Sequence, residues 1–144
     1  MKKVKKKLIF LVDDDALYLK SLEIQFIECE LFDVKTFATG ELCVENLTLN
    51  PDIVVLDYRL SGVDKTAIDG LETLDRIKAA NEDIHVIMLS EQDKIEVAVN
   101  CMKHKATDYI VKSETAFIRL LKAINEIIKN QKLEKTLNWY MEKM

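Results

Sequence analysis

The chain has 144 residues, with 21 lysines and arginines against 25 aspartates and glutamates and a formal net charge of −4. This length suits one domain, and its 49% of hydrophobic residues can build one sizeable core. An acidic chain is not expected to bind nucleic acid directly, and no apolar run approaches the roughly 18 residues of a membrane span, so we expect a cytoplasmic protein.

Short apolar runs alternate with amphipathic stretches along the chain. The first run follows a basic segment, residues 2–7, which is either a basic arm or, as we favour, a solvated lead-in to a strand. Five strands are expected, at residues 8–12, 32–37, 53–56, 84–89 and 109–111. The first, third and fourth are almost continuously apolar, which is typical of parallel strands covered on both faces, whereas residues 32–37 alternate and suit a sheet edge.

Segments at helical spacing separate these strands. They cover residues 17–27, 42–47, 71–77 and 95–102, and a fifth follows Ser113, a candidate N-cap, and runs through residues 117–128. Strict alternation of strands and helices predicts an α/β fold of (βα)₅ type, doubly wound around a parallel sheet. Cys29, Cys43 and Cys101 fall in helical segments without CxxC spacing, so we expect free, reduced thiols.

The last helix has no clear end in the sequence. After residue 128 the apolar pattern thins without a breaker, so we divide the chain into a domain of residues 1–128 and a C-terminal helical extension of residues 129–144. The extension could dock on its own domain, pair with a second chain or link to an output domain. The sequence leaves all three open.

Polar residues follow four of the apolar runs. In a parallel sheet, ligands bind beyond the carboxyl ends of the strands, where we find Asp13, Asp14, Asp57, Ser90 and Lys112. Gathered carboxylates repel one another unless a cation lies among them, and oxygen ligands suit Mg²⁺, with Mn²⁺ as a substitute. The hydroxyl and the ammonium would suit the oxygens of a phosphoryl group on Asp57, which ends the third strand.

Simpler interpretations exist for single residues of this set. Asp13 to Asp15 could only cap and open a helix, and we assign Asp15 to that role alone. Tyr109 by itself is typical of a half-buried strand aromatic, and Lys112 by itself of a surface lysine. Their joint placement at strand ends favours a site.

Five motifs in order resemble the receiver domain of bacterial response regulators, whose simplest relative is the chemotaxis regulator. The likeness covers about residues 7–128 and rests on Val12-Asp13-Asp14-Asp15, Pro51-Asp52-Ile53-Val54-Val55-Leu56-Asp57, Asp69-Gly70-Leu71, Val86-Ile87-Met88-Leu89-Ser90 and Ala106-Thr107-Asp108-Tyr109-Ile110-Val111-Lys112. It implies a flavodoxin-like five-stranded sheet of order 2-1-3-4-5.

The resemblance also implies a role for each site residue. Asp57 would be the phosphoacceptor, and the metal ligands would be Asp13, Asp14, Asp57 and the Arg59 backbone carbonyl. Lys112 would pair with the phosphate. Ser90 would move toward the phosphoryl group and Tyr109 would act as the aromatic switch.

The chain departs from the family pattern at four places, one of which is Lys105, where relatives often have glycine. The loop from Tyr58 to Asp69 is about five residues longer than usual, with Ser61 at the place of a proline. We expect this loop to cover part of the acceptor or to alter partner choice. Glu91 replaces a small residue and could slow phosphorylation, and Ser113 replaces a proline whose peptide bond is commonly cis in relatives.

We therefore predict a two-component receiver that takes a phosphoryl group from a sensor histidine kinase or phosphotransfer protein and switches a protein-binding surface without metabolic turnover. Its output would reach a downstream protein or an output domain, with homodimerisation through the fourth helix, fifth strand and fifth helix or through the extension as an option. The main alternative is a scaffold that works without phosphorylation. A haloacid-dehalogenase-type phosphatase is disfavoured, because Leu17 stands where a Thr or Val is often found and no capping insert is evident.

Overall fold

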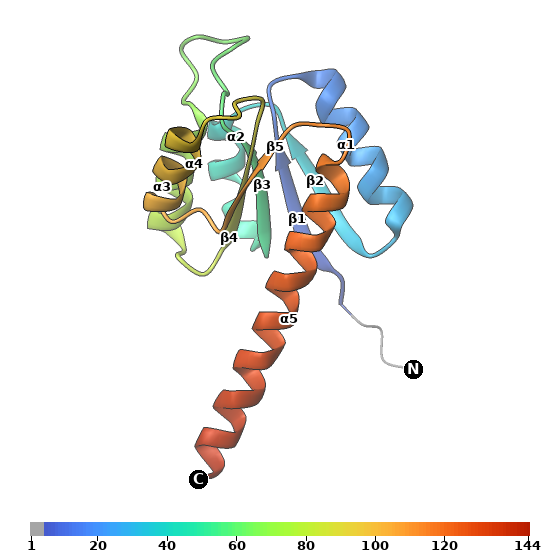
Figure 1. Ribbon diagram of the computed structural model, residues 1–144, viewed down its shortest axis with the longest axis vertical. Helices are drawn as coiled ribbons and strands as arrows, with labels where there is room; N and C mark the ends of the chain where they lie inside the picture. The colour runs from blue at the N-terminus through green and yellow to red at the C-terminus, as the bar shows by residue number, and fades with distance from the viewer. Residues whose placement is uncertain (1–4) are drawn as a thin grey trace.

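A computed structural model describes residues 5–144 of the chain. At its centre lies a parallel sheet of five strands (Figure 1). The strands are β1 (Lys7–Val12), β2 (Phe32–Phe37), β3 (Ile53–Asp57), β4 (His85–Ser90) and β5 (Asp108–Val111), in the order β2-β1-β3-β4-β5. The predicted (βα)₅ fold, strand order and edge position of β2 are confirmed. Of the predicted basic segment, Lys2, Lys3 and Val4 lie outside the described residues.

Helices cover both faces of the sheet. On one face lie α1 (Ala16–Cys29) and α5 (Ala116–Lys143), and on the other lie α2 (Gly40–Glu45), α3 (Gly70–Ala80) and α4 (Ile95–Lys103) (Figure 1). A 3₁₀ turn, Leu47–Leu49, follows α2. The three cysteines lie in α1, α2 and α4 and are free, as predicted.

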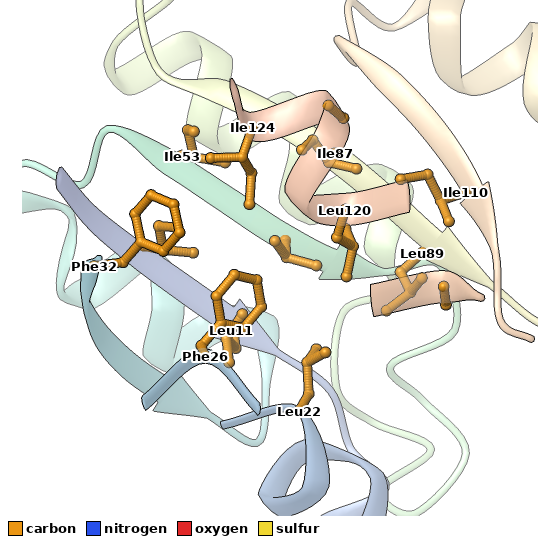
Figure 2. Packing of buried hydrophobic residues seen from close by; sticks show 14 of the residues in the cluster. Leu11, Leu22, Phe26, Phe32, Ile53, Ile87, Leu89, Ile110, Leu120 and Ile124 are labelled. Carbon is orange, nitrogen blue, oxygen red and sulfur yellow. The ribbon is translucent and has the colours of Figure 1, made fainter. Parts of the chain in front are cut away.

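The strands supply side chains to two separate cores because successive residues point to opposite faces. Ile9, Leu11, Ile53 and Val55 pack toward α1 and α5, whereas their neighbours in the sequence pack toward α2, α3 and α4. Figure 2 shows the α1 and α5 side, where Leu22 and Phe26 of α1 approach Leu120 and Ile124 of α5 over the sheet. This two-sided burial explains why β1, β3 and β4 read as continuous apolar runs.

Helix starts agree with the sequence in one case and differ in another. Asp15 caps α1, accepting hydrogen bonds from the amides of Leu17 and Tyr18 at 3.1 and 3.2 Å. The prediction that Ser113 caps α5 is wrong. Residues 113–115 form a turn, closed by the Ala116 amide on the Ser113 carbonyl at 3.1 Å, and the helix begins only at Ala116.

Two backbone features bear on the departures from the family pattern. No cis peptide bond occurs within residues 5–144, so the Lys112–Ser113 bond is trans. Lys105 adopts a left-handed conformation with φ 75°, which glycine, the residue expected there from the resemblance, adopts at less cost than lysine.

The α5 helix continues without interruption to Lys143 and projects beyond the sheet (Figure 1). Residues 132–144 are all exposed, and they include Leu133, Leu137 and Tyr140, each more than half exposed. The predicted division at residue 128 stays a prediction. None of the helices among residues 5–144 has the length and apolar character needed to cross a membrane.

Candidate functional site

The polar residues predicted at strand ends lie together at the carboxyl edge of the sheet. Asp13 directly follows β1, Asp57 ends β3, Ser90 ends β4 and Lys112 follows β5. Asp13, Asp57 and Ser90 are only 2%, 6% and 2% exposed, although all three are polar. Burial of polar groups at this cost is typical of a functional site in which they serve one another or a ligand.

Three carboxylates and one ammonium form the centre of this edge. Oxygens of Asp13, Asp14 and Asp57 lie within 4.8 Å of one another. The Lys112 Nζ lies 2.9 Å from Asp13 Oδ2 and 3.5 Å from Asp57 Oδ1, and 4.4 Å from the centre of the Tyr18 ring. One lysine therefore balances only part of the negative charge of three carboxylates.

The excess of negative charge at the site shifts the pKa values of the buried groups. Burial, with the nearby charge of Asp13, raises the pKa of Asp57 from 3.8 to about 8, while Lys112 and the Arg59 amide act in the opposite direction. Burial alone would lower the pKa of Lys112, but its pairing with Asp13 and Asp57 outweighs burial and raises it. An added cation would relieve the repulsion.

The residues present fit a divalent cation. Apart from its ion pair with Lys112, the buried Asp13 Oδ2 has no hydrogen-bond donor among residues 5–144. Three neighbouring carboxylates, one of which has an oxygen with a lysine as its only partner, form the kind of oxygen donor set that Mg²⁺ prefers. Arg59, whose carbonyl was predicted as a ligand, lines the same cavity and donates its amide to Asp57 Oδ1 at 3.4 Å.

The cavity above the carboxylates is open and has a volume of about 770 Å³. Its lining includes Asp57, Ser90 and Lys112. It also includes Glu91, which stands where a small residue was expected, and Val63, which belongs to the longer loop. Glu91 is exposed and brings a fourth carboxylate to the lining. The cavity therefore has room for a small anionic group next to Asp57.

Ser90 and Tyr109 are linked through one residue of the β4–α4 loop. Ser90 Oγ accepts a hydrogen bond from the Gln92 amide at 3.0 Å, and the Tyr109 hydroxyl donates to the Gln92 carbonyl at 2.6 Å. Any movement of this loop therefore affects both side chains. The switch roles assigned to Ser90 and Tyr109 stay predictions.

The loop between β3 and α3 is tied to the site, which the sequence did not reveal. Asp14 Oδ2 accepts hydrogen bonds from the amides of Gly62 and Val63 at 3.0 and 3.1 Å. Asp69 Oδ1 accepts from the amides of Leu60 and Ser61 at 2.8 and 3.0 Å and from Ser61 Oγ at 2.9 Å. The sequence offered one signal for the contact with Asp14, the glycine at position 62 within this loop.

Comparison with known proteins identifies the family. The family model described as the response regulator receiver domain matches residues 9–125. The chain belongs to this family. It is therefore a receiver domain of two-component signalling.

Relatives of this receiver are longer proteins. It is 26% identical over 136 residues to a cyclic di-GMP phosphodiesterase of Thermotoga maritima, a match that covers 94% of this chain and 35% of that protein. It is 35% identical over 106 residues to the nitrogen assimilation regulatory protein NtrX of Azorhizobium caulinodans, covering 72% of this chain and 22% of that protein. The receiver thus spans about a third or less of each of these relatives.

Solved receiver structures share the fold. The BeF3-activated receiver domain of DrrB from Thermotoga maritima is 28% identical, with a TM-score of 0.71, and the match covers 87% of this chain and 99% of that chain. The predicted family and fold of this receiver are confirmed. The roles of its individual site residues stay predictions.

Proposed function

We propose that this receiver accepts a phosphoryl group on Asp57 from a phosphohistidine of a histidine kinase or phosphotransfer protein, with Mg²⁺ required. The observation that carries the proposal is that Asp14, Asp57 and Lys112 line one cavity and that the buried Asp13 lies beside all three. Asp57 has the nucleophilic oxygens, and in-line transfer needs little beyond positioning and compensation of charge.

The residues of the chain would share this work. An Asp57 oxygen would attack the phosphorus, the P–N bond to the donor imidazole would break, and the imidazole would take up a proton as it leaves. Lys112, already within 3.5 Å of Asp57, would pair with the phosphoryl oxygens, and the Ser90 hydroxyl would donate to one of them. A cation held by Asp13, Asp14, Asp57 and the Arg59 carbonyl would offset the charge of the transferred group.

The output of the switch would be a changed binding surface. Transfer of the Ser90 hydroxyl from the Gln92 amide to the phosphoryl group would shift the loop that also holds Tyr109. We place the responding surface on α4, β5 and α5, in a cytoplasmic protein whose downstream partner is another protein or an output domain. Mn²⁺ should replace Mg²⁺.

The test is intact-mass spectrometry after incubation with acetyl phosphate. We expect a gain of one phosphoryl group with Mg²⁺, and no gain in EDTA or in Asp57→Ala. Beryllofluoride should form a complex with the wild-type chain under the same conditions. Absence of both the phosphoryl group and the beryllofluoride complex would contradict the proposal.

One observation favours a second function, a scaffold that binds partners without phosphorylation. Glu91 lines the acceptor cavity, where its carboxylate would repel an incoming phosphoryl group. The scaffold would bind the same partner with equal affinity in the wild type and in Asp57→Ala. The two functions are therefore separated by the dependence of partner affinity on phosphorylation.

A further inference from the structure

Residues 60–69 form a strap beside the acceptor cavity, and the strap is internally ordered. At its tip, the Asp64 carboxylate accepts hydrogen bonds from the amide and the hydroxyl of Thr66 at 2.9 and 2.6 Å, and the Asp64 carbonyl accepts from the Ala67 amide at 3.1 Å. Such local bonds hold a loop in one conformation. The strap thus has the means to present its amides in a fixed place.

Both ends of the strap are anchored without help from the metal site. At its beginning, Asp69 Oδ1 gathers the amides of Leu60 and Ser61 and the Ser61 hydroxyl. At its far end, the Ile68 amide donates to Glu41 Oε2 of α2 at 3.2 Å. Asp69 stands at the N-cap position of α3, but its side chain makes no capping hydrogen bond there and binds Leu60 and Ser61 instead.

Between these anchors, the strap reaches Asp14. The amides of Gly62 and Val63 both donate to the same oxygen, Oδ2, at 3.0 and 3.1 Å. Glycine favours this approach, because a Cβ at residue 62 would lie 3.1 Å from Asp14 Oδ2 and would push that oxygen away by a few tenths of an ångström. The other oxygen, Oδ1, accepts no hydrogen bond from residues 5–144 and remains available as a ligand.

We propose that the strap is a positioning element for the metal ligand Asp14. By holding Oδ2 with two amides, it restricts rotation of a carboxylate that lies beside Asp13 and Asp57 and leaves Oδ1 without a hydrogen bond, so that a divalent cation binds more tightly than it would without the strap. Hydrogen bonds from amides to a carboxylate are charge-assisted, and fixed outer partners raise the affinity of metal ligands. The inference rests on the proposed function for the cation site itself and for the role of Asp14 as one of its ligands.

Affinity for Mn²⁺ and for Mg²⁺, measured by titration calorimetry without any phosphodonor, tests this proposal. Gly62→Ala crowds Asp14 Oδ2, and Asp69→Ala releases the beginning of the strap. Each should weaken binding by about three- to tenfold, the effect of losing one or two partly exposed hydrogen bonds to a charged group. Asp69→Asn keeps an acceptor oxygen and should restore most of the affinity.

The matched control is Thr66→Ala, which loosens the tip of the strap but touches no site residue, and its affinity should equal that of the wild type. Thermal unfolding in EDTA establishes that each variant is folded before titration. Equal or tighter binding by both Gly62→Ala and Asp69→Ala would overturn the proposal, because the strap would then be neutral or would compete with the cation. Absence of cation binding by the wild type would overturn both this proposal and the metal dependence of the proposed function. If the wild type is not phosphorylated but the strap variants still bind the cation more weakly than the wild type, only the proposed function is overturned.

Discussion

Replacement of Gly70 by alanine should damage both stability and phosphorylation. Gly70 opens α3 directly against the chain that follows the acceptor, and its amide donates to the Tyr58 carbonyl at 3.0 Å. An added Cβ would meet the Asp57 carbonyl and would lie 2.6 Å from the Tyr58 carbonyl oxygen and 2.8 Å from Tyr58 Cα. These atoms belong to the backbone, so no side-chain rotation can make room.

The size of the effect follows from this geometry. Ordinary contacts begin near 3.4 Å, so α3 and the acceptor segment would have to separate by roughly 1 Å at the closest point, the Asp57 carbonyl. Overpacking of this kind costs about 1–3 kcal/mol, which corresponds to a fall in Tm of roughly 3–10 °C for a chain of this length. Because the displaced backbone carries Asp57, the rate of phosphorylation by acetyl phosphate should fall by roughly tenfold or more.

Differential scanning calorimetry and a phosphorylation time course measure the two effects. Gly62→Ala is the control for the calorimetry alone, because a Cβ there meets only the Asp14 carboxylate, and its Tm in EDTA should stay close to that of the wild type. A Gly70→Ala chain with a Tm within a degree of the wild type and an unchanged rate would refute the packing argument.

Four further predictions concern charge, metal and backbone. In EDTA, the raised pKa of Asp57 means that the folded chain binds a proton more tightly than the unfolded chain between pH 3.8 and about 8. The free energy of unfolding should therefore fall as pH rises through that window, and Asp57→Asn should reduce the fall measured by thermal melts. Mg²⁺ at about one hundred times its Kd should stabilise the chain by about 2.7 kcal/mol, and Asp13→Asn should remove most of this gain in the same melts. Lys105→Gly should raise the free energy of unfolding by up to about 1 kcal/mol in urea titrations, since φ is 75° there, and a loss of stability would contradict this. Glu91→Ala should speed phosphorylation by acetyl phosphate by roughly two- to tenfold, and an equal or slower rate would show that this carboxylate does not oppose the donor.

The parts of the fold that were predicted from the sequence are those in which burial is simple. Apolar runs such as Ile53–Leu56 indicate strands because helices cover both sheet faces, and strand ends then locate Asp57 and Lys112. The start of α5 was predicted wrongly because a serine before an apolar pattern is compatible with a cap or with a turn. Only the bond from the Ala116 amide to the Ser113 carbonyl distinguishes the two.

Contacts between distant segments could not be predicted in the same way. Gly62 and Asp14 are 48 residues apart, and their hydrogen bond depends on the exact course of a loop whose length departs from the family pattern. The link from Ser90 through Gln92 to Tyr109 likewise joins a strand end to a neighbouring strand across a loop. Local propensity has no information on such contacts, because they form only after the sheet is assembled.

The same contacts support Asp57 over its two neighbours as the acceptor. Asp13 has the shorter ion pair with Lys112, at 2.9 Å, and Asp14 is held through Oδ2 by the two amides of the strap. Asp57 has only longer contacts, 3.5 Å to Lys112 Nζ and 3.4 Å to the Arg59 amide. A carboxylate whose oxygens are less tightly bonded gives up less when one of them attacks phosphorus, whereas the firmly held pair is better suited to bind a cation. The proposed division of labour among the three carboxylates would therefore follow from how strongly each is held.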